Sequence, residues 1–253
     1  MSAGPLGLVP ADPLGLLRRG LHRPGKIPRY LFGLLVPSSR WGPEWRRRDG
    51  VVTFEPGGYA ASPRTRPEFA ANLAHEVSGL WALLDDLEAH DLDRSLEVGC
   101  GYGRLSPWLA TRSDWHVALD PDGRALANAT EQYREWELEF VRGRAETLPC
   151  PDDAFDLVVT WTVLQHVPDG TIGAATSELR RVLSPDGHLV CCERVEPPAD
   201  DHIWPRSIEE YDRLLAPLSL VEVRDRPVEP TWSDAMPTDE PSERLLAFRG
   251  PDG

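Results

Sequence analysis

The chain has 253 residues, of which 41% are hydrophobic, 27% are charged and nine are Trp. This length and composition exclude a disordered or fibrous protein and predict one folded domain with an appendage. Residues 1–50 hold nine Lys or Arg against three acids, whereas the other residues hold 18 against 38, a balance of −20. Because so acidic a body repels phosphates, we expect no DNA or RNA substrate.

The cysteines form no C-x-x-C pair and have no His at metal-ligand spacing; they are Cys100, Cys150, Cys191 and Cys192. We therefore expect neither a zinc site nor a redox motif, and no bound metal. Reduced thiols, together with the lack of a signal-peptide pattern, predict a cytoplasmic protein.

Residues 1–64 are rich in Pro, Gly and Arg and show little periodicity, which predicts a basic extended arm with one short helix at most. The domain itself is predicted to span 65–253. Within the arm, five basic residues between positions 18 and 29 precede the apolar stretch 30–36, and Trp41 and Trp45 follow it. Two interpretations stay open. The arginines of the arm either pair with the acidic body and cover its cleft, or contact an anionic lipid surface together with the aromatic residues.

A helix is predicted to begin near Pro67, because proline is favoured at a first helical position. Leu73, Val77, Leu80 and Leu84 recur at spacings of three and four, which predicts one amphipathic helix over 68–87. We interpret this helix as a cover for the core rather than as part of a cofactor site.

Beyond this helix, short apolar runs alternate with helical stretches. Strands are predicted at 95–98, 115–119, 138–141, 157–160 and 189–192, and helices at 105–111, 124–136 and 171–183. This alternation predicts a doubly wound, mostly parallel sheet. A helix at 208–215 then precedes two strands at 219–224 and 244–248, which we expect to form a closing hairpin.

The most specific motif is Leu96-Glu-Val-Gly-Cys-Gly-Tyr-Gly-Arg104, between a predicted strand and a predicted helix. Gly99, Gly101 and Gly103 allow a tight turn and bring backbone N–H groups against a ligand. A dinucleotide-binding turn would need G-x-G-x-x-G, but Arg104 and Ser106 occupy the third glycine position in the two registers. The motif thus disfavours a nicotinamide-dependent oxidoreductase, which stays as an alternative beside a non-catalytic binding module.

Asp120 ends the second predicted strand about twenty residues later, where a carboxylate can accept hydrogen bonds from both ribose hydroxyls. The loop and this acid resemble the class I S-adenosylmethionine-dependent methyltransferases, whose first loop reads E/D-x-G-x-G-x-G and whose second strand ends in an acid. The resemblance covers residues 94–195. It implies S-adenosylmethionine as cofactor, with Glu97 near its amino-acid end, Gly99 and Gly101 beneath it, and Asp120 on its ribose.

Further segments extend the resemblance, with one departure. Residues 143–158 are similar to the third and fourth cofactor segments of the family, but Arg144 stands where the family usually has an Asp that accepts from the adenine amino group. Since Arg can only donate, we expect the N–H of Ala145 and either Glu146 or stacking to hold adenine. The stretch 158–168 resembles the exit of the fourth strand, which implies that Thr160 edges the cofactor.

Two residues near the expected methyl group are candidates for catalysis. His166 could act as general base, since an ordinary pKa near 6.5 suits proton transfer at neutral pH; alternatively it only bonds the loop backbone. Glu193 either orients the substrate or forms a surface pair with Arg194. For Glu97, the competing interpretations are a helix cap and an ion pair with Arg104.

The resemblance implies an α/β fold: a doubly wound, mostly parallel seven-stranded Rossmann-like sheet with an N-terminal helical appendage and an antiparallel last strand. The predicted activity is methyl transfer from S-adenosylmethionine to a small molecule or a sugar. A lipid-linked glycan, methylated on a hydroxyl or a uronate carboxyl, would fit a peripheral contact of residues 1–50 with the inner face of the cell membrane.

Overall fold

The computed structural model describes residues 45–48, 51–54, 67–90, 92–136, 138–197, 202–228 and 243–251. Its helices are α3 (Pro67–Asp86), α4 (Ser106–Leu109), α5 (Gly123–Gln132), α6 (Asp169–Val182), α7 (Ile208–Leu215) and the 3-10 turn η2 (Leu164–His166). Its strands are β1 (Trp45–Arg48), β2 (Val51–Phe54), β3 (Leu92–Val98), β4 (Ser113–Asp120), β5 (Glu139–Arg142), β6 (Phe155–Trp161), β7 (Leu183–Arg194), β8 (Ser219–Asp225) and β9 (Glu243–Arg249).

Seven strands form one sheet in the order β5-β4-β3-β6-β7-β9-β8, and only β9 runs antiparallel to its neighbours. Leu96 of β3 pairs with Val117 of β4 on one side and with Val158 of β6 on the other. The predicted fold class is thereby confirmed, including the antiparallel last strand and the hairpin that β8 and β9 make at one edge.

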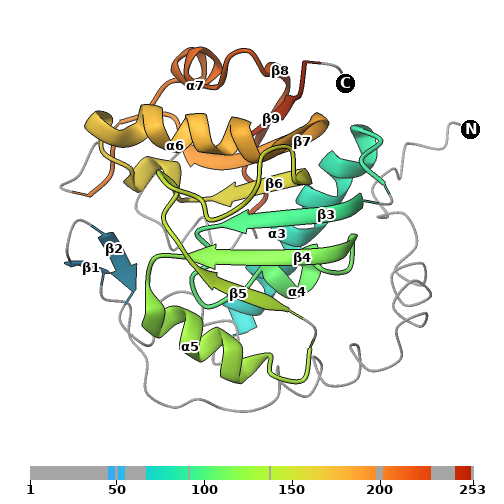
Figure 1. Ribbon diagram of the computed structural model, residues 1–253, viewed down its shortest axis with the longest axis vertical. Coiled ribbons are helices and arrows are strands. Elements are labelled where there is room, and N and C mark those ends of the chain that lie inside the picture. Colours follow the sequence, from blue (N-terminus) through green and yellow to red (C-terminus); the bar gives the residue numbers. More distant parts are fainter. Residues whose placement is uncertain are drawn as a thin grey trace, which may run out of the picture.

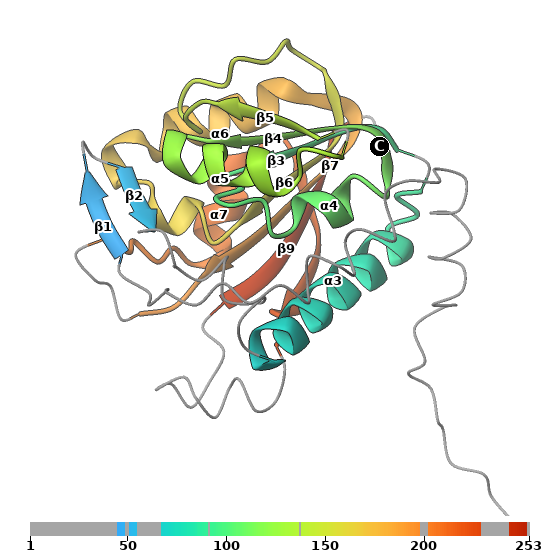
Figure 2. The same ribbon diagram turned by 90° about the horizontal axis from the view of Figure 1, so that it is seen from below.

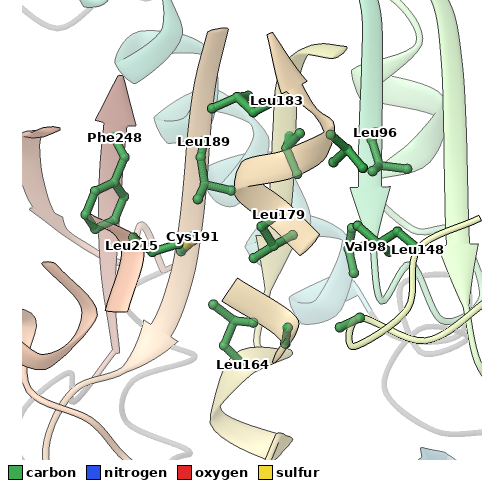
Figure 3. Close-up of a cluster of buried hydrophobic side chains, with 14 of the residues drawn as sticks. Leu96, Val98, Leu148, Leu164, Leu179, Leu183, Leu189, Cys191, Leu215 and Phe248 are labelled. Atoms are coloured by element: carbon green, nitrogen blue, oxygen red, sulfur yellow. The ribbon is translucent and has the colours of Figure 1, made fainter. Parts of the chain in front are cut away.

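Helices cover both faces of this sheet, with α6 in front of it and α3 behind it in Figure 1; Figure 2 shows α3 and α6 apart on its two sides. Two large apolar clusters result, because strands buried on both faces present side chains to both layers. One lies between the sheet and α6 and α7, and Figure 3 shows part of it, including Leu96, Leu179, Leu189, Leu215 and Phe248. The other lies under α3, as the amphipathic pattern over 68–87 predicts.

Several element ends differ from the predicted ones. The helix expected over 105–111 is only the single turn α4, and α5 ends at Gln132 rather than at residue 136. Asp122 caps α5 by accepting from the N–H of Arg124 at 2.9 Å. Strand β7 begins six residues earlier than predicted, at Leu183, and its register against β6 shifts between the pairs Phe155–Leu183 and Leu157–His188.

Little of the predicted arm lies within the described residues. The sequence predicts no strand there, yet β1 and β2 pair as a separate antiparallel two-stranded sheet, with Trp45 opposite Phe54. The predicted short helix and the apolar stretch 30–36 lie outside the described residues. In the part of the chain that the structure describes, no helix is both long enough and apolar enough to cross a membrane.

Candidate functional site

The predicted cofactor residues meet at the carboxyl ends of four adjacent parallel strands, β5, β4, β3 and β6. The chain builds the sheet outward from β3 to β5 in one direction, then returns to place β6 on the other side of β3. Open α/β sheets bind ligands at such a reversal, outside the carboxyl ends of the strands. Glu97, the glycine loop and Asp120 all lie there.

The glycine loop follows β3 directly, and its three glycines all have positive φ. A Cβ atom on Gly99 would lie 2.3 Å from a methyl carbon of Val163, so this glycine lets the loop pack against the segment after β6. Among the described residues, a Cβ atom on Gly101 would meet no atom within 4 Å. Gly101 therefore leaves its backbone bare beside open space, which fits the close approach of a cofactor.

Asp120 ends β4 and is 9% exposed. Its Oδ2 accepts from the N–H of Gly101 at 2.8 Å, and its Oδ1 accepts from the N–H of Asp122 at 2.8 Å. Burial raises the pKa of Asp120 to about 6. A carboxylate has about four acceptor positions, so an ionised Asp120 retains room for two ribose hydroxyls.

Glu97 is buried one strand away, and the structure excludes one of its predicted interpretations. Its Oε2 accepts from the hydroxyl of Ser106, the first residue of α4, and lies 3.8 Å from Nε2 of His116. The predicted alternative pairing with Arg104 is wrong, because that guanidinium donates to Glu76. Glu97 thus ties β3 to α4 below the glycine loop.

Thr160 and Glu193 are both wholly buried, and they bind each other. The Thr160 hydroxyl donates to Oε1 of Glu193 at 2.9 Å, and the Glu193 carboxylate also accepts from the backbone N–H groups of Val163 (3.1 Å) and Gln165 (3.0 Å). Burial raises the pKa of Glu193 to about 7. Thr160 and Glu193 thus join the ends of β6 and β7 under the loop after β6, and the predicted surface pair of Glu193 with Arg194 is wrong, because Glu193 is wholly buried.

His166 is partly buried in η2. Its Nδ1–H donates to the carbonyl of His202 at 2.8 Å, and the two rings stack with centroids 5.8 Å apart. The contact with loop backbone, the alternative interpretation, is thus present. Burial lowers the pKa of His166 to about 4, so the ring is neutral at pH 7 and, with the proton on Nδ1, only Nε2 could accept a further proton.

On the predicted adenine side, Arg144 and Glu146 form an ion pair of 3.1 Å. Ala145 between them is buried, and the N–H of the preceding Gly143 donates to the carbonyl of Asp120 at 3.2 Å. The positive charge of Arg144, which departs from the family pattern, is therefore neutralised by the carboxylate of Glu146. Adenine would have to share Glu146 with this guanidinium.

Sequence reasoning missed two buried groups beside the site. Arg206 is 1% exposed and donates to the carbonyls of Leu164 (2.9 Å) and Val167 (2.7 Å), which holds the loop after β6 from a distant segment. Glu76 lies wholly buried on α3. The sequence did indicate that Glu76 is buried, because it stands three residues after Leu73 and four before Leu80, on the apolar face of the predicted helix. No comparable pattern marks Arg206.

Residues 96–191 match the family model described as a methyltransferase domain. An uncharacterized methyltransferase of Mycobacterium tuberculosis is 30% identical over 123 residues, which cover 49% of this chain and 61% of the relative. A fatty-acid O-methyltransferase of Mycolicibacterium smegmatis is 31% identical over 52% of this chain and 46% of its own. A demethylmenaquinone methyltransferase of Clavibacter sepedonicus is 33% identical over 52% of each chain.

Among solved structures, an S-adenosylmethionine-dependent methyltransferase of Leishmania major superposes with a TM-score of 0.60 at 19% identity, over 70% of this chain and 72% of that one. This likeness concerns the fold. The chain spans about three fifths or less of the length of these curated relatives. Over residues 96–191 the chain is thus similar in sequence to a methyltransferase domain, and its fold is similar to that of a solved S-adenosylmethionine-dependent methyltransferase.

Proposed function

We propose that the chain transfers the methyl group of S-adenosylmethionine to a small molecule or a sugar carried on a lipid. One observation supports the transferase part above others: the bare backbone of Gly101, beside open space, is joined to the carboxylate of Asp120. The cofactor supplies a methyl group already activated by its positive sulfur. The protein's own task is then to hold the cofactor and to orient the acceptor for in-line attack.

Each residue of the site has a defined part in that task. Asp120 would accept from the ribose hydroxyls, the backbone of Gly101 would lie against the cofactor, and Glu97 would lie toward its amino-acid end. The loop after β6 forms one wall, fixed from below by Glu193 and from the side by Arg206.

Near this wall, the predicted base for proton removal from the acceptor is His166, but its Nε2 is buried. With a pKa of about 4, His166 is a weak base, because burial favours its neutral form. An acceptor that is already an anion, such as a carboxylate, needs no base at all. This favours a carboxyl acceptor, such as a uronate, over a sugar hydroxyl.

The lipid part of the proposal rests on charge and on the relatives. The basic arm carries its charges next to the apolar stretch 30–36, a combination typical of segments that lie on anionic membranes. Two relatives act on a fatty acid and on demethylmenaquinone, as their names state. We infer that the arm brings the domain to the inner face of the cell membrane, where such acceptors reside.

Two assays test these statements. A thermal-shift panel with S-adenosylmethionine, S-adenosylhomocysteine, NAD and NADP should show stabilisation by the first two alone. A response only to NAD or NADP would favour the oxidoreductase instead. Transfer of radiolabelled methyl into a lipid extract of the source cells should then occur with the wild-type chain and not with Asp120→Ala. Label confined to water-soluble products would overturn the lipid part.

The membrane contact has its own test. The five basic residues between positions 18 and 29 are replaced by Gln in the full chain, and sedimentation with vesicles that contain phosphatidylserine is compared with the wild type. We expect most of the wild type to sediment and most of the variant to stay in solution. Equal sedimentation of the two would remove the arm from the proposal.

A further inference from the structure

A buried cluster of charged side chains lies on the α3 side of the sheet, next to the glycine loop. At its centre is Glu76 of α3: its Oε2 accepts from the guanidinium of Arg104 and its Oε1 from that of Arg226, which follows β8. Arg226 also donates to Glu243, at the start of β9, at 2.7 Å. Both guanidinium carbons lie 5.9 Å from the ring centroid of Trp161, at the end of β6.

The charges of this cluster balance. Burial by itself raises the pKa of Glu76, but the two guanidinium groups hold it below its ordinary value, so Glu76 is ionised at neutral pH. Two cations thus face two carboxylates. Because a buried ion pair contributes little net stability compared with apolar side chains of the same shape, stability alone is a weak reason for such a cluster. What it does fix is the relative position of the groups that it joins.

Arg104 is the member that connects the cluster to the cofactor site, since it follows Gly103 directly. The entry of the glycine loop is held by the N–H groups of Gly99 and Cys100, which donate to the carbonyl of Leu119 at 2.7 and 2.9 Å. At the exit, α4 has only four residues; the hydroxyl of Ser106 ties it to Glu97 of β3, and Arg104 adds a second tie, to Glu76 of α3. Since glycines restrict the backbone least, a loop with three of them needs a fixed exit to hold one conformation.

We propose that Glu76 is a positioning residue of the cofactor site: through Arg104 it fixes the exit of the glycine loop, and with it the backbone of Gly101. Glu76 touches neither cofactor nor acceptor and acts only through Arg104. This inference rests on the proposed function, because it assigns an effect on a cofactor that binds at the loop.

The test is calorimetric binding of S-adenosylhomocysteine to four full-length single variants and one double variant, with melting temperatures measured in parallel. Glu76→Gln and Arg104→Met remove the anchor, and Arg104→Lys retains its charge. Arg226→Met is the matched control, because Arg226 binds the same buried carboxylate, and its side chain is 6% exposed against 13% for Arg104, but it lies outside the loop. Glu76→Gln and Arg104→Met should weaken binding about tenfold.

The remaining results separate positioning from a merely structural role. Arg104→Lys should recover part of the affinity. The double variant Glu76→Gln/Arg104→Met should bind no more weakly than either single variant, because each single substitution already removes the contact between Glu76 and Arg104. Arg226→Met should lower the melting temperature with the affinity unchanged. Equal losses of affinity in Arg226→Met and Arg104→Met, or wild-type affinity in Arg104→Met, would overturn the inference.

Failure of the inference and failure of the proposed function remain distinguishable. If the wild type binds S-adenosylhomocysteine and Arg104→Met binds it equally well, only the role of Glu76 is lost. If the wild type does not bind it, the proposed function is overturned and the inference with it. Should Glu76→Gln not fold, Arg104→Met and its control Arg226→Met decide the question without it.

Discussion

The backbone N–H of Gly101 donates to Oδ2 of Asp120 at 2.8 Å, so the glycine loop after β3 and the end of β4 meet on one carboxylate. The other oxygen of Asp120 accepts from the N–H of Asp122, just before α5. The side chain that is placed to hold the ribose is thus also the one that joins the two loops. Substitution of Asp120 should therefore affect ligand binding more than the loss of any single hydrogen bond elsewhere in the fold.

Asp120→Ala should weaken the binding of S-adenosylhomocysteine by about 1–3 kcal/mol, because charge-assisted hydrogen bonds to the ribose are lost. Isothermal calorimetry measures this directly. Asp122→Ala serves as the control: Asp122 caps α5, so its loss should cost about 1 kcal/mol of stability and leave the affinity unchanged. Unaltered affinity in Asp120→Ala would reject the ribose role.

Cofactor binding should depend on pH through Asp120. Burial raises the pKa of this carboxyl to about 6, and protonation turns one of its oxygens into a donor, which lowers its capacity to accept. The affinity for S-adenosylhomocysteine should therefore be greatest above pH 6 and fall as the pH is lowered through it. Asp120→Asn should bind more weakly throughout and lose this dependence; a wild-type affinity that stays constant from pH 5 to pH 8 would contradict the prediction.

The first two glycines of the loop should respond differently to alanine. In Gly99→Ala the new methyl would lie 2.3 Å from Val163, at φ +77°, so we expect a loss of about 2 kcal/mol in the free energy of unfolding. In Gly101→Ala the methyl meets no atom of the described residues within 4 Å, and only the left-handed backbone costs about 1 kcal/mol.

Gly101→Ala should nevertheless lose more affinity for S-adenosylhomocysteine than Gly99→Ala, although it loses less stability, because its methyl enters the space assigned to the cofactor. Urea denaturation and calorimetry on the same preparations measure the two effects. Full affinity in Gly101→Ala would show that the cofactor does not approach this backbone.

Glu193 should make stability depend on pH. Its pKa is raised by burial from 4.5 to about 7, so between these values the unfolded chain has lost a proton that the folded chain still holds. The folded state therefore binds more protons, and the free energy of unfolding falls as the pH rises from 4.5 to 7. The contribution of this one group is about 2–3 kcal/mol.

Glu193→Gln removes that titration and should flatten the dependence, although its amide cannot accept from both Val163 and Gln165 and costs about 1 kcal/mol overall. Chemical denaturation at pH 5 and pH 7.5 compares the two chains. An equal pH dependence in the wild type and Glu193→Gln would contradict the assignment.

Much of the architecture could be predicted because its signals are local. Apolar runs of strand length, the stripe over 68–87 and the glycines after β3 each reflect short-range geometry, and so they placed the strands, α3 and the loop correctly. The ends of α4 and α5 were less predictable, since tertiary packing ends a helix where local propensity would continue it.

The partners of the charged residues were not predictable in this way. Arg104 binds Glu76, 28 residues earlier, rather than the nearby Glu97, and Glu193 turns inward to the loop after β6 rather than outward to solvent. A sequence by itself determines which side chains can carry charge and on which strand or loop they stand. Only the packing of distant segments decides which of them lose water together, and this loss forces each buried charge to take a particular partner.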